Sequence, residues 1–196
     1  MQNKKDNKGG YTIIETMIAV SLFTVIIIAG MGALLNANLL HQKSQNMRSI
    51  IDNLSFIMED MSRNLRTGYS YHCLTGNDNL SSVGTPLSCS SGWGVAFESA
   101  STFTDINNPN NQWVYYIDNG RIFKSTQGSF ATAIQLTPDE VVIGGASAFL
   151  VSGAESVLTN QQQPFVTIRL VGTITFKNAV TPFSLQTSVS QRLVDI

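Results

Sequence analysis

Charged residues are scarce in this chain of 196 residues. They make up only 13% of it, and 12 Lys and Arg nearly cancel 13 Asp and Glu. A chain with so little net charge lacks the basic footprint of a nucleic-acid-binding protein, so we expect no nucleic acid among its partners. Intrinsic disorder does not fit either, because aromatic and β-branched residues are plentiful enough to form a core. The length corresponds to one domain, or to one domain with an appendage.

The sequence also lacks the short motifs of common enzymes. It contains no Gly-x-Ser-x-Gly elbow, no His-Glu-x-x-His pair and no phosphate-binding glycine loop. Its two histidines, His41 and His72, have no catalytic partner visible in the sequence. We therefore expect the protein not to be an enzyme.

No cofactor is expected, although one segment carries many oxygen-bearing side chains. Residues 105–111, Asp-Ile-Asn-Asn-Pro-Asn-Asn, offer the oxygen ligands that calcium prefers. The segment lacks the glycine and the glutamate of the known calcium-binding loop. We therefore favour a polar surface loop over a calcium site at these residues.

Only two cysteines are present, Cys73 and Cys89, and both lie in loop-like sequence rich in Gly, Ser and Asn. A zinc site does not fit them, because only His72 is nearby and the spacing does not match. Outside the cytoplasm an even pair of cysteines favours a disulfide. Closing this 17-residue loop would stabilise the fold by about 3 kcal/mol. The alternative is two unpaired thiols.

One long uncharged run dominates the N-terminal part of the sequence. The 24 residues 17–40 include no charge and no proline. A bilayer core about 30 Å thick needs about 20 such residues in a helix, so this run predicts a transmembrane helix. Lys4, Lys5 and Lys8 precede it and favour a cytoplasmic N-terminus. An ordinary secretory signal fits poorly, since the run is too long and no Ala-x-Ala-like cleavage site is evident.

The junction before this run reads Gly10-Tyr11-Thr12-Ile13-Ile14-Glu15. Taken alone, Thr12 and Glu15 fit a capping box, and an acid in the first turn complements the helix dipole. In the wider sequence, a lysine-rich leader ends in glycine, an aromatic residue follows, and a glutamate stands five positions after the glycine. This arrangement resembles the class III signal of type IV pilins and type II secretion pseudopilins. The family pattern has Phe and Leu where this chain has Tyr11 and Ile13, which keep an apolar ring and a branched aliphatic side chain.

The resemblance implies a route of processing and assembly. A prepilin peptidase in the membrane would cleave after Gly10 on the cytoplasmic face and methylate the new amino group of Tyr11. The mature chain would keep 9 Lys and Arg against 12 Asp and Glu, a net charge of −3. The α-ammonium of Tyr11 would then pair with Glu15 of a neighbouring subunit. The implied partners are the peptidase, other minor and major pseudopilins or pilins, and inner-membrane lipid.

Beyond His41 the pattern becomes that of an amphipathic helix, which we expect to end at Gly68. Charged residues, among them Asp60, take one face of this segment. Apolar residues recur on the other face at three- and four-residue steps and predict one buried stripe. The stripe consists of Met47, Ile50, Ile51, Leu54, Ile57, Met58, Met61 and Leu65.

Residues 68–196 show no long helical period and consist of short predicted strands between turns. Asp118-Asn119-Gly120 is a strong hairpin signal because Asn-Gly tolerates positive φ. The predicted strands are 93–97, 113–117, 121–124, 141–143, 148–151, 165–170, 173–177 and 183–189. An antiparallel sheet packed on the helix stripe gives an α+β fold, which is also the pilin-like fold that the resemblance implies.

The arrangement of the head, with its closing run at residues 183–192, resembles the heads of J-type minor pseudopilins. We expect a cytoplasmic leader (1–10), a transmembrane helix half (11–40), an amphipathic helix half (41–67) and an extracytoplasmic head (68–196). The expected function is that of a minor pseudopilin or minor pilin in the bacterial inner membrane, which helps initiate or cap a filament. The alternative is a single-pass, membrane-tethered binding domain, such as an adhesin or receptor, that is not assembled into a filament.

Overall fold

The computed structural model describes residues 10–80, 84–99, 112–155, 162–176 and 179–192. In these ranges the chain forms one long α-helix, α1 (Ile13–Thr67), followed by strands and the 3₁₀ helix η4 (Phe130–Thr132). The strands are β1 (Tyr69–Leu74), β2 (Cys89–Gly92), β3 (Gly94–Glu98), β4 (Gln112–Asp118), β5 (Arg121–Ser125), β6 (Ile134–Gln135), β7 (Val141–Ile143), β8 (Ala148–Ser152), β9 (Phe165–Phe176) and β10 (Ala179–Ser190). The predicted α+β class is therefore confirmed.

The chain divides into two compact units, Met1–Gln45 and Asn46–Ile196, and α1 contributes residues to both. In the first unit every residue from 10 to 42 is exposed, so this part of α1 contributes nothing to a buried core. The second unit contains the rest of α1 and the strands. All buried residues in the described part of the chain belong to this second unit.

The first sheet has the strand order β1-β3-β4-β5-β6, and its pairs are antiparallel. The β4–β5 hairpin turns at Asn119 and Gly120, whose φ angles are 47° and 73°. Positive φ at both turn residues is typical of the type I′ turn that Asn-Gly favours. Asp118 and Arg121 form the last pair before the turn. The hairpin predicted from Asp118-Asn119-Gly120 is therefore confirmed.

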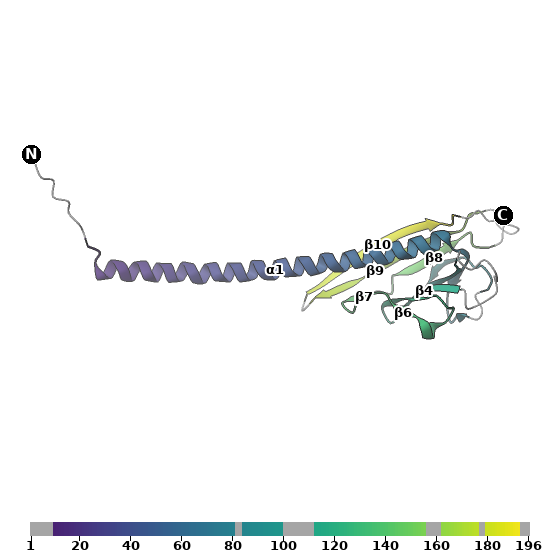
Figure 1. The fold of residues 1–196 in the computed structure, drawn as a ribbon, viewed down its shortest axis with the longest axis horizontal. Helices are drawn as coiled ribbons and strands as arrows, with labels where there is room; N and C mark the ends of the chain where they lie inside the picture. The colour runs from purple at the N-terminus through teal and green to yellow at the C-terminus, as the bar shows by residue number, and fades with distance from the viewer. Residues whose placement is uncertain (1–9, 81–83, 100–111, 156–161, 177–178, 193–196) are drawn as a thin grey trace, which may run out of the picture. The chain divides into compact units, whose positions relative to one another are not determined.

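The second sheet has the order β10-β9-β8-β2, and β7 also pairs with β9. β9 and β10 form a long antiparallel hairpin beside the C-terminal part of α1 (Figure 1). The sequence predicts a break in β9 at Val171 and Gly172, but the strand is continuous. Gly172 pairs with Phe183, and a Cβ at Gly172 would overlap the carbonyl oxygen of Val142 on β7. The glycine therefore permits the close approach of β7 and does not end the strand.

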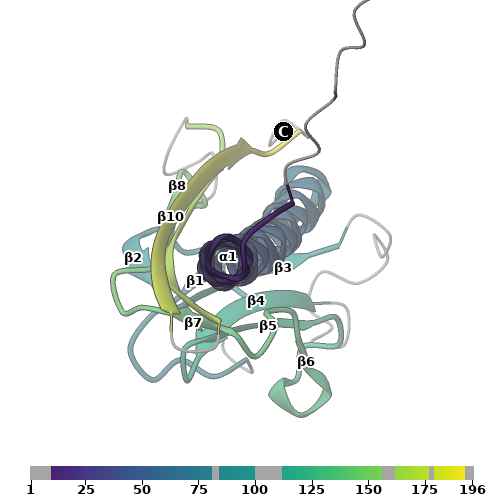
Figure 2. The ribbon, with the colours of Figure 1, turned by 90° about the vertical axis from the view of Figure 1, so that its left-hand side faces the viewer.

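The C-terminal part of α1 lies between the two sheets, with β8 and β10 on one side and β4 and β5 on the other (Figure 2). One cluster of buried residues joins this part of the helix to both sheets. Its helical members are Ile50, Leu54, Ile57, Met58, Met61 and Leu65.

The predicted stripe is confirmed at these six positions, and Met47 packs against the cluster while partly buried. The prediction is wrong at Ile51, which is 40% exposed. Adjacent helical residues point about 100° apart, so Ile51 is turned away from the face that Ile50 buries. The stripe is therefore narrower than the sequence indicates.

The sequence predicts loops at both cysteines, whereas the structure places Cys73 in β1 and Cys89 in β2. β1 is buried on both of its faces, so the alternating pattern that indicates a strand is lost there. β2 reads Cys-Ser-Ser-Gly and has no apolar pattern of its own. Its conformation is set by pairing with β8, where Gly92 lies opposite Phe149. Both strands thus depend on distant parts of the chain.

Candidate functional site

Gly10 and Tyr11 directly precede α1, and both are exposed. Among the described residues, a Cβ added to Gly10 would meet no other atom within 4 Å. The fold therefore does not require glycine at this position. Any requirement for a small residue at Gly10 has to come from a molecule that acts on this segment.

Glu15 lies in the first turn of α1 and is exposed. The backbone N–H groups of Glu15 and Thr16 donate to the carbonyl oxygen of Thr12 at 3.1 and 3.2 Å. The side-chain bonds of a capping box between Thr12 and Glu15 are not formed in the described structure. Within the described residues, the Glu15 carboxylate consequently has no hydrogen-bond or ion-pair partner.

Three hydroxyl side chains that follow Glu15 are bonded to their own helix. The hydroxyls of Thr16, Ser21 and Thr24 donate to backbone carbonyls three or four residues earlier, at distances of 2.8 to 2.9 Å. A hydroxyl satisfied in this way can enter lipid without a lost hydrogen bond. A carboxylate in the first turn could accept from the free N–H groups of its own helix, but Glu15 makes no such bond in the described structure. Glu15 is therefore a charged group in this segment that is available to a partner.

The surface around these groups is apolar. Among the described residues, α1 is the helix long and apolar enough to cross a membrane, with a mean hydropathy of 2.5 over its most apolar 18 residues. None of that stretch is buried within the chain. Water would solvate such a surface poorly, and burying apolar area gains about 25 cal/mol per Å². This part of α1 is suited to lipid or to the apolar helices of partners, and it is long enough for a single membrane span.

A disulfide joins Cys73 to Cys89, with their Cα atoms 5.9 Å apart. Cys73 belongs to the first sheet and Cys89 to the second, so the bond connects the two sheets covalently. A Cβ added at Gly92 would overlap the Sγ atom of Cys73. The glycine in β2 therefore leaves room for the bridge.

A polar network fastens α1 to the first sheet. The hydroxyl of Tyr115 donates to Oδ2 of Asp60 at 2.8 Å, and Lys124 Nζ donates to the same oxygen at 2.9 Å. Asn64 Nδ2 donates to Oδ1 of Asp60 at 3.0 Å and to the Tyr115 oxygen at 2.7 Å. Lys124 Nζ also lies 4.7 Å from the ring centroid of Trp113. The network fixes the position of the helix on β4 and β5.

The charges of this network are shifted by their surroundings. Burial by itself raises the pKa of Asp60, but hydrogen bonds from Lys124 and Tyr115 outweigh burial and leave the pKa below its ordinary value of 3.8. Burial is the largest cause that raises the pKa of Tyr115, and the Asp60 charge raises it further. Asp60 therefore remains a carboxylate and Tyr115 a neutral donor at physiological pH.

The residues predicted to be functional fall into two groups. Gly10, Tyr11 and Glu15 lie within six positions of one another at the start of α1, and Cys73 and Cys89 lie in the second unit. The leader before Gly10 and the calcium candidate at 105–111 lie outside the described residues. In the part of the chain that the structure describes, no group of three or more His, Cys, Asp or Glu residues could hold a metal ion.

Sequence reasoning missed the Asp60 network, because it assigned Asp60 to the charged face of the helix, opposite the buried stripe. A local signal was present, since Asp60 and Asn64 are four residues apart and can bond along one helix face. The long-range members Tyr115 and Lys124 had no such signal.

Comparison with known proteins finds no matching family model, no matching curated protein and no matching solved structure. The fold itself, a long apolar N-terminal helix followed by antiparallel sheets, is consistent with the pilin-like fold.

Proposed function

We propose that the protein is a minor pseudopilin or minor pilin, of the J-type kind, that helps initiate or cap a type II secretion pseudopilus or type IV pilus. The observation that carries this proposal is Glu15. It is a carboxylate without a partner in the described structure, in the first turn of a helix whose following surface is apolar and fully exposed. Such a group is costly in lipid unless a second molecule supplies a positive charge.

Processing would create that positive charge. Cleavage after Gly10 leaves a new α-ammonium on Tyr11, which the same peptidase would methylate. Gly10 and Tyr11 are both exposed, which supports access by a peptidase. A glycine at the cleaved bond lets the backbone enter a narrow active site, and the fold gives no other reason for glycine there.

Assembly would follow from the two surfaces of α1. Subunits would wait in the inner membrane with residues 11–40 in lipid, and would leave it by packing these helices together. The Tyr11 ammonium of one subunit would pair with Glu15 of its neighbour and set the register between them. The buried stripe and the Asp60 network would hold the far part of each helix on its own head.

Mapping the mature N-terminus tests this proposal. The full-length chain is expressed with and without a prepilin peptidase, and its N-terminal peptide is identified by mass spectrometry. We expect a chain that begins at Tyr11 and carries one added methyl group when the peptidase is present. A chain that keeps its leader in both samples would overturn the proposal and would favour the membrane-tethered binding domain.

A further inference from the structure

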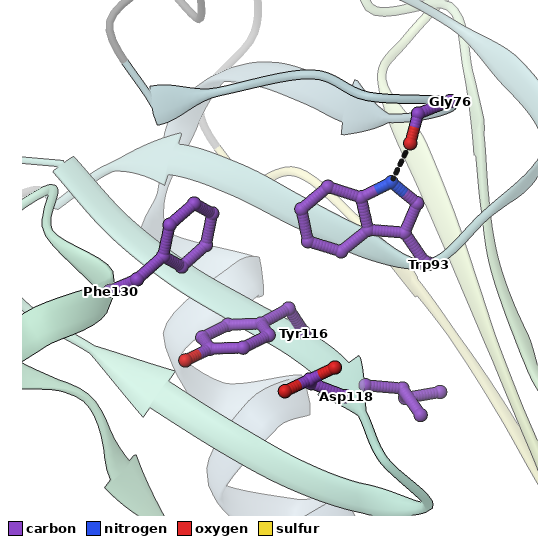
Figure 3. A pocket seen from close by; sticks show the side chains of 6 residues that line it. Gly76, Trp93, Tyr116, Asp118 and Phe130 are labelled. Carbon is purple, nitrogen blue, oxygen red and sulfur yellow. Dashed lines mark hydrogen bonds between the residues drawn. The ribbon is translucent and has the colours of Figure 1, made fainter.

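An aromatic hollow lies on the face of the first sheet that is turned away from α1. Successive residues of a strand point to opposite faces, so Tyr115 joins the core around α1 while Tyr116 joins a second buried cluster. On that outer face Trp93, Tyr116 and Phe130 surround a cavity of about 390 Å³. In Figure 3 the rings of Trp93 and Phe130 stand on either side, with the ring of Tyr116 between them and Asp118 beside it.

The walls of this aromatic hollow are held in place before any ligand arrives. The ring centroids lie 6.2 Å apart for Trp93 and Tyr116, 6.0 Å for Trp93 and Phe130, and 4.9 Å for Tyr116 and Phe130. Tyr116 also stacks on Phe123 at 5.3 Å. The indole N–H of Trp93 donates to the carbonyl oxygen of Gly76 at 3.2 Å, which fixes the ring and occupies its donor. A preformed site of this kind loses little conformational freedom on binding.

The groups that line the hollow are electron-rich. The rings of Trp93, Tyr116 and Phe130 line the hollow together with the carboxylate of Asp118, and Tyr116 meets the other two rings edge to face. The indole donor is already bonded, and the carboxylate accepts one hydrogen bond from its neighbour Asn119 at 3.0 Å. The nearby cations are engaged elsewhere, since Arg121 pairs with Asp139 at 2.6 Å and Lys124 with Asp60 at 2.9 Å. Burial raises the pKa of Tyr116, and the charge of Asp118 raises it further, so the carboxylate field reaches the ring. The hollow is thus electron-rich and, among the described residues, has no cation of its own.

We propose that the aromatic hollow formed by Trp93, Tyr116, Phe130 and Asp118 binds a quaternary ammonium group of the size of choline. Aromatic faces attract cations through the ring quadrupole, and a methylated cation is also dehydrated easily by apolar walls. A sugar would need donors as well as acceptors, and an anion would be repelled by Asp118. The proposal does not depend on filament assembly, because the hollow lies within the Asn46–Ile196 unit.

Ligand titration of the full-length chain tests the hollow. The protein is kept in a polyoxyethylene detergent, because a detergent with a choline headgroup would compete. Trp113→Phe leaves Trp93 as the single tryptophan of the chain, so indole fluorescence then reports on the hollow. Calorimetry on the wild-type chain checks that this substitution has not altered binding. We expect saturable binding of choline, and binding at least about fivefold weaker of its uncharged isostere 3,3-dimethylbutan-1-ol.

Two variants test the charge and the aromatic lining of the hollow separately, and a third variant serves as the control. Asp118→Asn keeps the size of an exposed side chain and should weaken choline binding by about threefold to tenfold. Phe130→Leu removes one aromatic ring from the lining and should weaken it by about threefold. Asp52→Asn removes an equal charge from the exposed side of α1 and should leave binding unchanged.

Binding of glycerophosphocholine distinguishes a lipid headgroup from a free quaternary amine as the source of the ammonium group. Equal binding of choline and glycerophosphocholine would assign the hollow to a lipid headgroup, and binding of choline alone would assign it to a free quaternary amine. Either result supports an ammonium site. Absence of saturable binding, or equal binding of choline and its uncharged isostere, would overturn the proposal.

Discussion

The hydroxyl of Tyr115 lies 2.8 Å from Oδ2 of Asp60, so a strand of the first sheet holds α1 by a hydrogen bond to a carboxylate. Both groups come from distant parts of the chain, and Asn64 and Lys124 complete their bonding. Other hydrogen bonds hold the end of α1, where the hydroxyl of Tyr71 donates to the carbonyl oxygen of Leu65 and the N–H of Arg192 donates to that of Arg66. The Asp60 network adds a side-chain anchor one to two turns earlier, on β4 and β5.

Replacing Tyr115 by Phe should lower the free energy of unfolding of the head by about 1–2 kcal/mol. The substitution removes a hydroxyl that donates to a charged acceptor and accepts from Asn64. Denaturant unfolding of the full-length chain, followed by circular dichroism, measures the change. Asp52→Asn on the exposed side of the helix serves as the control and should stay within about 0.5 kcal/mol of the wild type. An unchanged Tyr115→Phe variant would mean that the network adds no net stability.

The lowered pKa of Asp60 predicts acid sensitivity. Because this pKa lies below 3.8 in the folded head, the unfolded chain binds the proton more readily. The stabilisation is then complete above about pH 5 and is lost as the pH falls through the folded pKa. Between about pH 5 and pH 2 the free energy of unfolding should decrease more steeply in the wild type than in Asp60→Asn. Parallel pH profiles for the two proteins would contradict this assignment.

The Cys73–Cys89 bridge should be present in the exported protein. Intact-mass analysis after alkylation should find no modified thiol until a reductant is added. Replacing both cysteines by Ser should lower the free energy of unfolding by about 2–4 kcal/mol, because the bond restricts the unfolded chain. Membrane insertion should not change, since both cysteines lie in the second unit. Alkylation of both cysteines in the absence of a reductant would contradict this prediction.

Gly10→Val should block removal of the leader without disturbing the fold. A Cβ at Gly10 would meet no atom of the described residues within 4 Å, so we expect any effect to arise in the peptidase. An immunoblot with and without the peptidase follows the loss of about ten residues. Denaturant unfolding of the variant should match the wild type and serves as the control. Normal shortening of Gly10→Val would place the cleavage site elsewhere.

Glu15→Gln and Glu15→Leu should still be inserted and cleaved, yet recruit other minor subunits poorly. An ammonium left unpaired in an apolar helix bundle costs about 3–5 kcal/mol, which weakens association by roughly a hundredfold or more. Co-purification of full-length chains from membranes measures this loss. If Glu15 served only its own helix, Gln would retain the capping function and recovery of the complex would be normal. Full recovery with both variants would therefore contradict the intersubunit pair.

The features that the sequence predicts well are those encoded locally. The type I′ turn at Asn119 and Gly120 follows from two residues that tolerate positive φ, and the helical stripe follows from its spacing. β1 and β2 are not predicted from the sequence, because β1 is buried on both faces and β2 is defined only by its pairing with β8. The aromatic hollow and the Asp60 network need residues brought together across the sheet. No local pattern contains that pairing information.

Every residue from 10 to 42 is exposed, so substitutions in this segment should affect different measurements from substitutions in the buried core. A calorimetric scan of the full chain registers the cooperative loss of the Asn46–Ile196 unit, because that unit contains the described core. Substitutions at Gly10 or Glu15 should therefore leave the melting temperature untouched while changing maturation or recruitment. Substitutions at Tyr115 or Cys73 should do the reverse. We therefore expect that the melting temperature can be altered independently of maturation and recruitment.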